Sequence, residues 1–212
     1  MVAIIDYDAG NIKSVEKAVI KLGYECEITR DIETLKKADK LILPGVGAFG
    51  DAMAKLNDYG LTPVIRQLVL EEKKPIMGIC LGLQLFFDSS EESEGVEGLG
   101  LVRGKIVRIP EGEGRKIPHM GWNSLDFPKK SKLFNKIVKG SYVYFVHSYY
   151  LEAEDFEAII SPVWDFYNET TDRIPMGDWV WSDKPEHVQF KARSVVGGLF
   201  IKMLATQKLN DR

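Results

Sequence analysis

Cys80 is the residue whose type and neighbours most directly indicate covalent chemistry. It lies in the middle of residues 78–82 (GICLG), where a short apolar segment ends and a helical pattern begins. Glycines on both sides permit the tight strand-to-helix turn of a nucleophile elbow. The start of the following helix favours thiolate over thiol, which predicts a lowered pKa for Cys80. The structural alternative is a buried cysteine beside two glycines that allow close packing.

A second glycine-rich turn, residues 44–50 (PGVGAFG), follows the neighbouring apolar segment. In a parallel α/β sheet both turns lie at the carboxyl edge, where such sheets bind their ligands. Backbone N–H groups in a turn of this kind can stabilise a developing oxyanion. A plain tight turn and a phosphate cradle are the alternatives, although neither GxGxxG nor Walker A spacing occurs here.

Apolar strands alternate with amphipathic helices through the first hundred residues, which predicts a mostly parallel sheet with helices on both faces. One helix follows Asn11 as N-cap and closes at Gly23, and another is capped by Thr62 with Pro63 at its first position. The expected strands are residues 2–5, 41–43 and 76–79, and a further helix is expected over 83–87.

The second half changes to shorter extended segments, which predicts an antiparallel extension of the same domain. These segments are residues 106–109, 142–146, 158–160, 178–181 and 187–190, followed by a last helix from Ser194. The acidic stretch 89–97 is interpreted as a solvated loop. We therefore expect one α/β domain over residues 1–212.

Composition excludes several classes of protein. The chain has 212 residues and a formal charge of −3, which argues against a charge-driven grip on nucleic acid or on a membrane surface. No apolar stretch approaches the ~20 residues that span a bilayer, and no basic leader precedes the first strand. The two cysteines are too few for a disulfide scaffold. We expect a cytoplasmic protein.

Four motifs together resemble the class I glutamine amidotransferases and, more narrowly, the glutaminase subunits of imidazole glycerol phosphate synthase, an enzyme of histidine biosynthesis. They occur in the family's order, and the opening of the chain (residues 5–15) is similar as well. The motifs are residues 44–49 (PGVGAF), 78–84 (GICLGLQ), 116–123 (KIPHMGWN) and 144–149 (YFVHSY). The resemblance implies a flavodoxin-like α/β fold.

The resemblance also implies a mechanism. Cys80 would attack the side-chain amide of glutamine, form a glutamyl thioester and release ammonia. Backbone N–H groups near Val46 and Leu81 would hold the oxyanion, and Gly47 and Gln84 would help to seat the substrate. Neither a cofactor nor a metal is expected.

Ammonia would then pass to a separate (β/α)₈-barrel cyclase subunit in a heterodimer. The resemblance places Trp122 and His119 toward that partner, and His147 near the glutaminase site and the interface. A core aromatic is the alternative for Trp122, and a hydrogen-bonded strand histidine is the alternative for His147.

The family completes its catalytic triad with His-Pro-Glu after a Gln-Phe pair, and this chain departs from that pattern. Here Gln189-Phe190 is followed by Lys191, Ala192 and Arg193. A lysine with an ordinary pKa of about 10.4 is a poor base at neutral pH, and Arg193 would repel it. His187 is about 13 Å away along a strand, too far for a direct replacement.

Four functions remain open on these grounds. The first is a glutaminase subunit whose hydrolytic competence is in question, and the second is an amidotransferase subunit of another pathway. The third is a non-catalytic scaffold or regulatory subunit. The fourth is a cysteine hydrolase of the same fold that acts alone.

Overall fold

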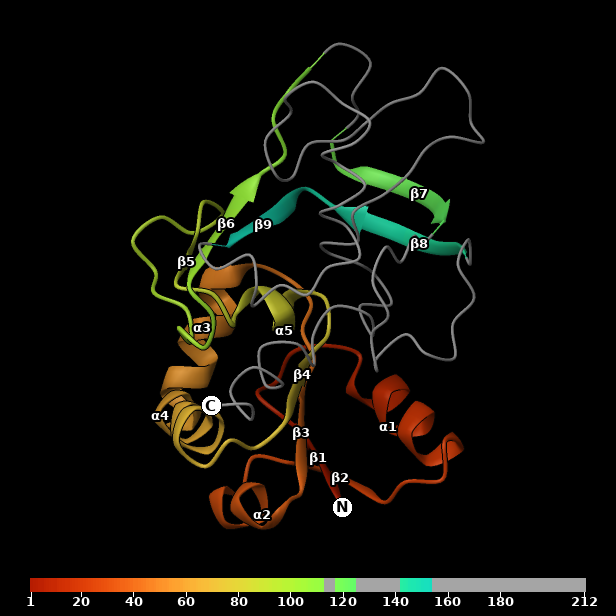
Figure 1. The fold of residues 1–212 in the computed structure, drawn as a ribbon, viewed down its shortest axis with the longest axis vertical. Coiled ribbons are helices and arrows are strands. Elements are labelled where there is room, and N and C mark those ends of the chain that lie inside the picture. Colours follow the sequence, from red (N-terminus) through yellow and green to blue (C-terminus); the bar gives the residue numbers. More distant parts are fainter. Residues whose placement is uncertain (113–116, 125–141, 154–212) are drawn as a thin grey trace.

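The core of the molecule is a four-stranded parallel sheet of order β2-β1-β3-β4 (Figure 1). The computed structural model describes residues 1–112, 117–124 and 142–153. The strands are β1 (Val2–Ile5), β2 (Cys26–Thr29), β3 (Lys40–Leu43) and β4 (Ile76–Gly78). The predicted parallel sheet is confirmed. β2 was not predicted, because this edge strand has half-buried and exposed positions before its buried last residue and does not form an apolar run.

Helices cover both faces of this sheet. Figure 1 shows α1 (Ile12–Lys21) on one side and α3 (Phe49–Asp58) and α4 (Leu61–Arg66) on the other. The connection from β2 to β3 contains α2 (Ile32–Lys37), and a π-helical turn, η1 (Gln67–Glu71), follows α4. The sheet face toward α3 and α4 belongs to the hydrophobic core, through Ala3, Ile5, Leu41, Leu43 and Ile76.

The predicted helix ends are partly confirmed. Asn11 precedes α1 as expected but makes no side-chain cap, and Gly23 closes the helix with φ +84°. The prediction that Thr62 caps the next helix is wrong. Gly60 is the N-cap of α4, and the Thr62 hydroxyl donates to Asn57 Oδ1 at 2.6 Å instead. Complete burial of Leu61 is consistent with a helix that starts two residues earlier than predicted.

Strand order fixes where a ligand can bind. The chain leaves β1 toward β2 on one side, and it later crosses to β3 on the other side of β1. Open parallel sheets bind ligands at such a switch point, outside the carboxyl ends of the strands. Residues 6–11, 44–48 and 79–80 follow β1, β3 and β4 at this edge.

The antiparallel extension is confirmed in the part of it that the structure describes. β6 (Gly104–Arg108) pairs with β5 (Ser89–Ser90) in parallel and with β9 (Tyr149–Ala153) antiparallel. β7 (His119–Ser124) pairs antiparallel with β8 (Tyr142–His147). The segments expected at 158–160, 178–181 and 187–190, and the helix from Ser194, lie outside the described residues.

The acidic stretch 89–97 does more than the solvated loop that its composition predicts. Its first two residues form β5. A carboxylate oxygen of Glu92 then accepts the backbone N–H of Phe49, and the Ser93 hydroxyl accepts that of Gly50, both at 2.9 Å. This stretch therefore caps α3, whose own N-cap residue, Ala48, has no side-chain acceptor.

Two buried histidines join β7 to β8. His119 and His147 are directly opposite in the strand register, with His119 Nδ1 and His147 Nε2 3.3 Å apart. His147 Nδ1 is 3.0 Å from the carbonyl oxygen of Tyr149, which can only accept. In neutral His147 the Nε2 atom is then an acceptor, so His119 Nδ1–H donates to it. Burial lowers the pKa of His119 to about 4.

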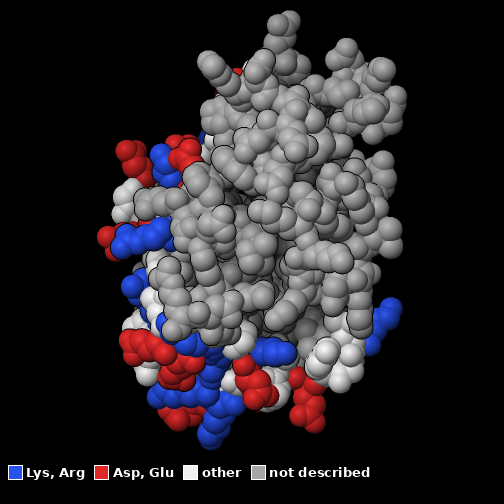
Figure 2. Space-filling model, in the orientation of Figure 1, with Lys and Arg blue, Asp and Glu red and all other residues white. Residues whose placement is uncertain are grey.

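Charges of both signs are interspersed over the described part of the surface in Figure 2. Lysine and arginine side chains alternate there with aspartate and glutamate, as expected for a formal charge of −3. In the described part of the chain, no helix is both long enough and apolar enough to cross a membrane.

The histidine pair predicts acid-sensitive stability. The folded-state pKa of His119 is about 4 against an ordinary 6.5, so lowering the pH protonates this group in the unfolded chain first. Stability from this group is complete above pH 6.5 and falls as the pH drops toward 4. The difference at pH 5 is on the order of 2 kcal/mol in the free energy of unfolding. Urea unfolding measures this free energy at pH 8 and at pH 5. Between these two pH values it should fall less for His119→Gln than for the wild type. Equal losses in the two chains would contradict this prediction.

Candidate active site

Cys80 lies in the strained turn that the sequence predicts. It follows β4 and precedes α5 (Leu81–Gln84), with φ +53° and ψ −117°. A non-glycine residue rarely adopts such angles, and the strain is on the order of 1–3 kcal/mol. This is the backbone geometry of a nucleophile elbow, and it leaves the thiol half-buried at the carboxyl edge of the sheet.

The glycines of this elbow also satisfy a packing requirement. A Cβ on Gly78 would lie 2.5 Å from the Cα of Leu83, and one on Gly82 would lie 1.9 Å from the carbonyl oxygen of Leu43. Any side chain at either position would displace backbone atoms. The sequence left two alternatives for these glycines, a nucleophile elbow and close packing around a buried cysteine. In the structure the strained turn and the close packing occur together.

The expected lowering of the Cys80 pKa is wrong. Burial raises the pKa of this thiol; the backbone N–H of Leu81 acts in the opposite direction, and the charge of Glu92 raises it further. The helix that begins here is only four residues long, so its dipole is small. Desolvation outweighs the helix start, and the thiol is predominantly protonated at neutral pH.

The turn 44–47 packs directly against the elbow. A Cβ on Gly45 would lie 2.7 Å from the backbone nitrogen of Gly82 and 2.6 Å from the hydroxyl oxygen of Tyr7. Gly47 has φ +100°, and the intervening Val46 side chain is 57% exposed. The predicted proximity of the two glycine-rich turns is confirmed by these contacts.

The other predicted site residues fall into two groups. Leu81 and Gln84 are buried in α5 beside Cys80. His119, Trp122 and His147 lie in the β7–β8 pair. Trp122 is 66% exposed, so the core alternative for it is wrong. Positions 187, 191 and 193 lie outside the described residues.

Two residues that the sequence analysis did not single out belong to this region. Tyr7 is fully buried, and its hydroxyl donates to the carbonyl oxygen of Pro44 at 2.7 Å. Glu92 caps α3 and adds negative charge near Cys80. A tyrosine two residues after an apolar strand was a usable signal for Tyr7, whereas the fold alone brings Glu92 near Cys80.

This arrangement can perform acyl transfer. A thiol nucleophile and the backbone N–H groups of a neighbouring turn are two of the groups needed to form a thioester from an amide, and a nearby carboxylate can bind a substrate's ammonium group. Among the described residues, no group of three or more His, Cys, Asp or Glu side chains is placed to hold a metal ion.

Comparison with known proteins gives the family. Residues 3–190 match the family described as Glutamine amidotransferase class-I. The chain is 50% identical over 158 residues to the "Imidazole glycerol phosphate synthase subunit HisH" of Moorella thermoacetica, which covers 74% of each chain. It is 43% identical over 174 residues to "Imidazole glycerol phosphate synthase subunit HisH 2" of Methanococcus maripaludis, over 82% of this chain and 85% of that one.

A solved structure titled "Crystal structure of glutamine amidotransferase" superposes with a TM-score of 0.56, over 74% of this chain and 77% of that one. Its sequence is 18% identical, so this likeness concerns the fold. The sequence match, by contrast, extends from β1 through the Cys80 elbow and beyond the last described strand. On that match the chain belongs to the class I glutamine amidotransferase family.

Proposed function

We propose that this chain is the glutaminase subunit of an imidazole glycerol phosphate synthase and delivers ammonia to a barrel cyclase subunit in a cytoplasmic heterodimer. The observation that carries the proposal is the strained Cys80 elbow packed against the 44–47 turn. The two relatives described above, which are named as subunits of that synthase, support the choice of pathway.

The reaction follows from the groups at the site. The Cys80 sulfur forms a bond to the side-chain amide carbon of glutamine, and the carbonyl electron pair moves to oxygen. Backbone N–H groups near Val46 and Leu81 would stabilise that oxyanion, and Gly47 and Gln84 would help to seat the substrate. As the oxyanion collapses, the C–N bond breaks, and the proton released by the thiol passes to the nitrogen, which leaves as ammonia. Water then hydrolyses the thioester, which gives glutamate and regenerates the thiol.

Glu92 supplies a binding group for the substrate. Its charge already acts on Cys80, and glutamine brings an ammonium group to the same space. A carboxylate that accepts a hydrogen bond from an ammonium group contributes about 1.5–3 kcal/mol. Glu92 would therefore orient glutamine by its amino group, while the 44–47 turn receives the amide oxygen.

An exposed apolar strip on β7 supports the partner. Met120 and Trp122 are 59% and 66% exposed and point to the same face of the strand. The Trp122 ring contacts Tyr144 of β8 edge to face, with ring centroids 5.5 Å apart. Large exposed aromatic and methionine side chains of this kind are typical of protein–protein interfaces.

Lys191 and Arg193 favour a second candidate, a subunit that keeps the fold and the partner but has lost hydrolysis. The raised pKa of Cys80 makes a base more necessary, and neither residue is suited to that task at neutral pH. The experiments below separate this candidate from the first.

Substitution of Cys80 tests the nucleophile. In the presence of a cyclase subunit and its ribotide ligand, Cys80→Ala should abolish ammonia release from glutamine. Cys26→Ala is the matched control, because Cys26 is also half-buried but lies at the amino end of β2, away from the site. It should retain wild-type activity.

The same assay, repeated with added ammonia, tests the partner. A complex that turns over only with added ammonia would show a subunit that has lost its glutaminase chemistry. Glutamine-driven turnover that survives Cys80→Ala would contradict the proposed mechanism.

Neutralising Glu92 should have two separate effects. Glu92→Gln should raise KM for glutamine by about tenfold or more, because a charge-assisted hydrogen bond is lost. It should also speed alkylation of Cys80 by iodoacetamide at pH 8, because removal of the negative charge lowers the pKa of the thiol. The amide oxygen can still accept the Phe49 N–H.

Glu91→Gln is the control for this variant. The Glu91 carboxylate is exposed and accepts the backbone N–H of Arg108, so neither quantity should change. Equal effects of the two substitutions would contradict a specific role for Glu92.

Restoring the family's base and carboxylate tests the second candidate. Lys191→His combined with Arg193→Glu should increase glutamine hydrolysis by orders of magnitude, whereas each single change should do little, because base and orienting group act as a unit. Steady-state ammonia release measures this. An unchanged rate in the double variant would mean that the proton is handled by other residues.

A further inference from the structure

Tyr7 lies beneath the turn that faces the nucleophile. The residue follows β1 by two positions, and its side chain has no exposed surface. Its hydroxyl donates to the carbonyl oxygen of Pro44 at 2.7 Å. Burial raises the pKa of this hydroxyl, and the charge of Cys80 raises it further, so Tyr7 remains a neutral donor close to the nucleophile.

This hydrogen bond fixes the first peptide plane of the turn. In a trans peptide the carbonyl and the following N–H point in opposite directions, so holding the Pro44 oxygen also sets the direction of the Gly45 N–H. Val46 lies between two glycines, which allow wide backbone rotation. An anchor at Pro44 therefore limits the orientations of the next peptide planes.

The turn has little room between Tyr7 and the elbow. The position of a Cβ on Gly45 is within 3 Å of both the Tyr7 hydroxyl oxygen and the Gly82 nitrogen. The Tyr7 hydroxyl and the Gly82 nitrogen thus both approach the turn at Gly45, where they leave no room for a side chain. Loss of that oxygen would leave a space and a carbonyl without its donor.

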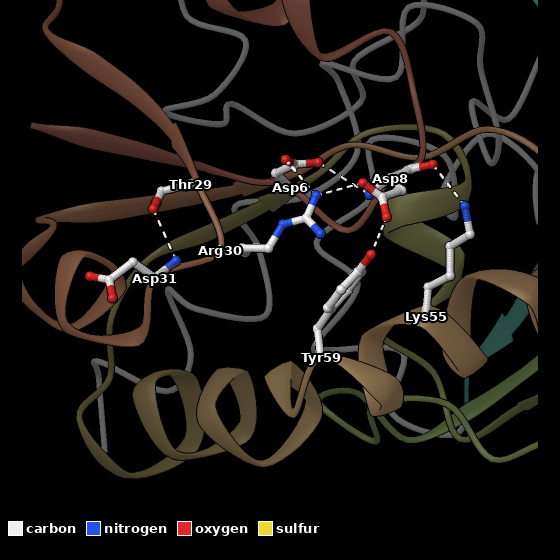
Figure 3. Close-up of polar contacts among 7 residues, drawn as sticks. All are labelled: Asp6, Asp8, Thr29, Arg30, Asp31, Lys55 and Tyr59. Carbon is white, nitrogen blue, oxygen red and sulfur yellow. Dashed lines mark hydrogen bonds and ion pairs between the residues drawn. The ribbon is translucent and has the colours of Figure 1, made fainter.

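The loop that carries Tyr7 is itself held in place (Figure 3). Arg30 binds the carboxylates of Asp6 at 2.8 Å and Asp8 at 2.5 Å, and it lies over the ring of Tyr59 at 4.2 Å. Asp8 has φ +61°, and the Tyr59 hydroxyl donates to its carboxylate. These contacts stabilise a loop conformation that a non-glycine residue rarely adopts.

The same loop is tied to the helix that continues the turn. Lys55 Nζ in α3 donates to the backbone carbonyl of Asp8 at 2.9 Å, and Tyr59 caps the end of α3. Because α3 begins at Phe49, directly after the turn, the loop after β1 holds both the start of the turn and the helix beyond it.

We propose that Tyr7 is a positioning residue for amide cleavage: its hydroxyl holds the Pro44 carbonyl so that the N–H groups of residues 45–47 are directed at the oxyanion of the Cys80 adduct. This rests on the proposed glutaminase function and assigns to Tyr7 no direct contact with the substrate.

The test compares two reagents on the same thiol in the full chain, with a cyclase subunit present. The diazoketone 6-diazo-5-oxo-L-norleucine has a ketone oxygen where glutamine has its amide oxygen. The Cys80 sulfur bonds to its diazo carbon, which gains a proton, and N₂ leaves. Iodoacetamide alkylates the same sulfur with loss of iodide and uses no oxyanion site. Mass spectrometry follows both adducts.

Tyr7→Phe removes only the hydroxyl oxygen. It should slow labelling by the diazoketone at least tenfold, leave the iodoacetamide rate within twofold of wild type, and lower kcat for glutamine with KM within twofold. Tyr24→Phe is the matched control, because Tyr24 is 61% exposed and lies before β2, and it should change none of these quantities.

The outcomes separate the two proposals. Equal diazoketone rates in wild type and Tyr7→Phe would overturn the role of Tyr7 and leave the glutaminase function standing. Parallel changes in both labelling rates would show a packing role only and would also overturn it. A wild-type chain that reacts with iodoacetamide but not with the diazoketone would overturn the glutaminase function, and the role of Tyr7 with it.

Discussion

The candidate site depends on a contact between two backbone segments with no side chain between them. At the carboxyl edge of the sheet, Gly82 lies so close to the carbonyl oxygen of Leu43 that a Cβ would be 1.9 Å away. This contact brings the elbow after β4 against the turn after β3. The positive φ of Cys80 and the burial of its thiol both occur at this point of close approach. Cys80 and the 44–47 turn are therefore positioned by the backbone.

Close packing has an electrostatic consequence for the nucleophile. Desolvation raises the pKa of Cys80, and the Leu81 N–H compensates only in part. A thiol that is protonated at rest needs a group to take its proton during attack. The resemblance to the family would place that base and its carboxylate at positions 191 and 193, which hold lysine and arginine in this chain. The placement of the thiol and the removal of its proton are thus separate requirements, and the contacts of the described residues concern the first.

The sequence predicted much of the fold and part of the site. Apolar runs identified β1, β3 and β4, and the glycines around Cys80 identified the elbow, because both patterns are local. The sign of the Cys80 pKa shift was wrong, since it depends on how deeply the assembled fold buries the thiol.

The contacts that local patterns missed join residues far apart in the chain. Glu92 caps Phe49 and Tyr7 binds Pro44, separations of 43 and 37 residues. Ala48 precedes α3 and has no side chain that can accept a hydrogen bond. The sequence therefore shows only that some other group must cap the free N–H groups of this helix. Thr62 is the opposite case. Its side chain is suited to capping a helix, but it bonds to Asn57 instead, and α4 begins before it.

Strand pairing and two side-chain hydrogen bonds connect the exposed strip on β7 to the site. β7 pairs with β8, and His147 of β8 binds the Tyr149 carbonyl at the start of β9. β9 pairs with β6, β6 pairs with β5, and Glu92 beyond β5 binds the first residue of α3 beside the 44–47 turn. Such a path couples partner binding to the site only if one of its elements has two arrangements. In the 44–47 turn, which adjoins this path, Val46 lies between two glycines that permit wide backbone rotation, and Tyr7 holds the end of the turn that precedes Val46.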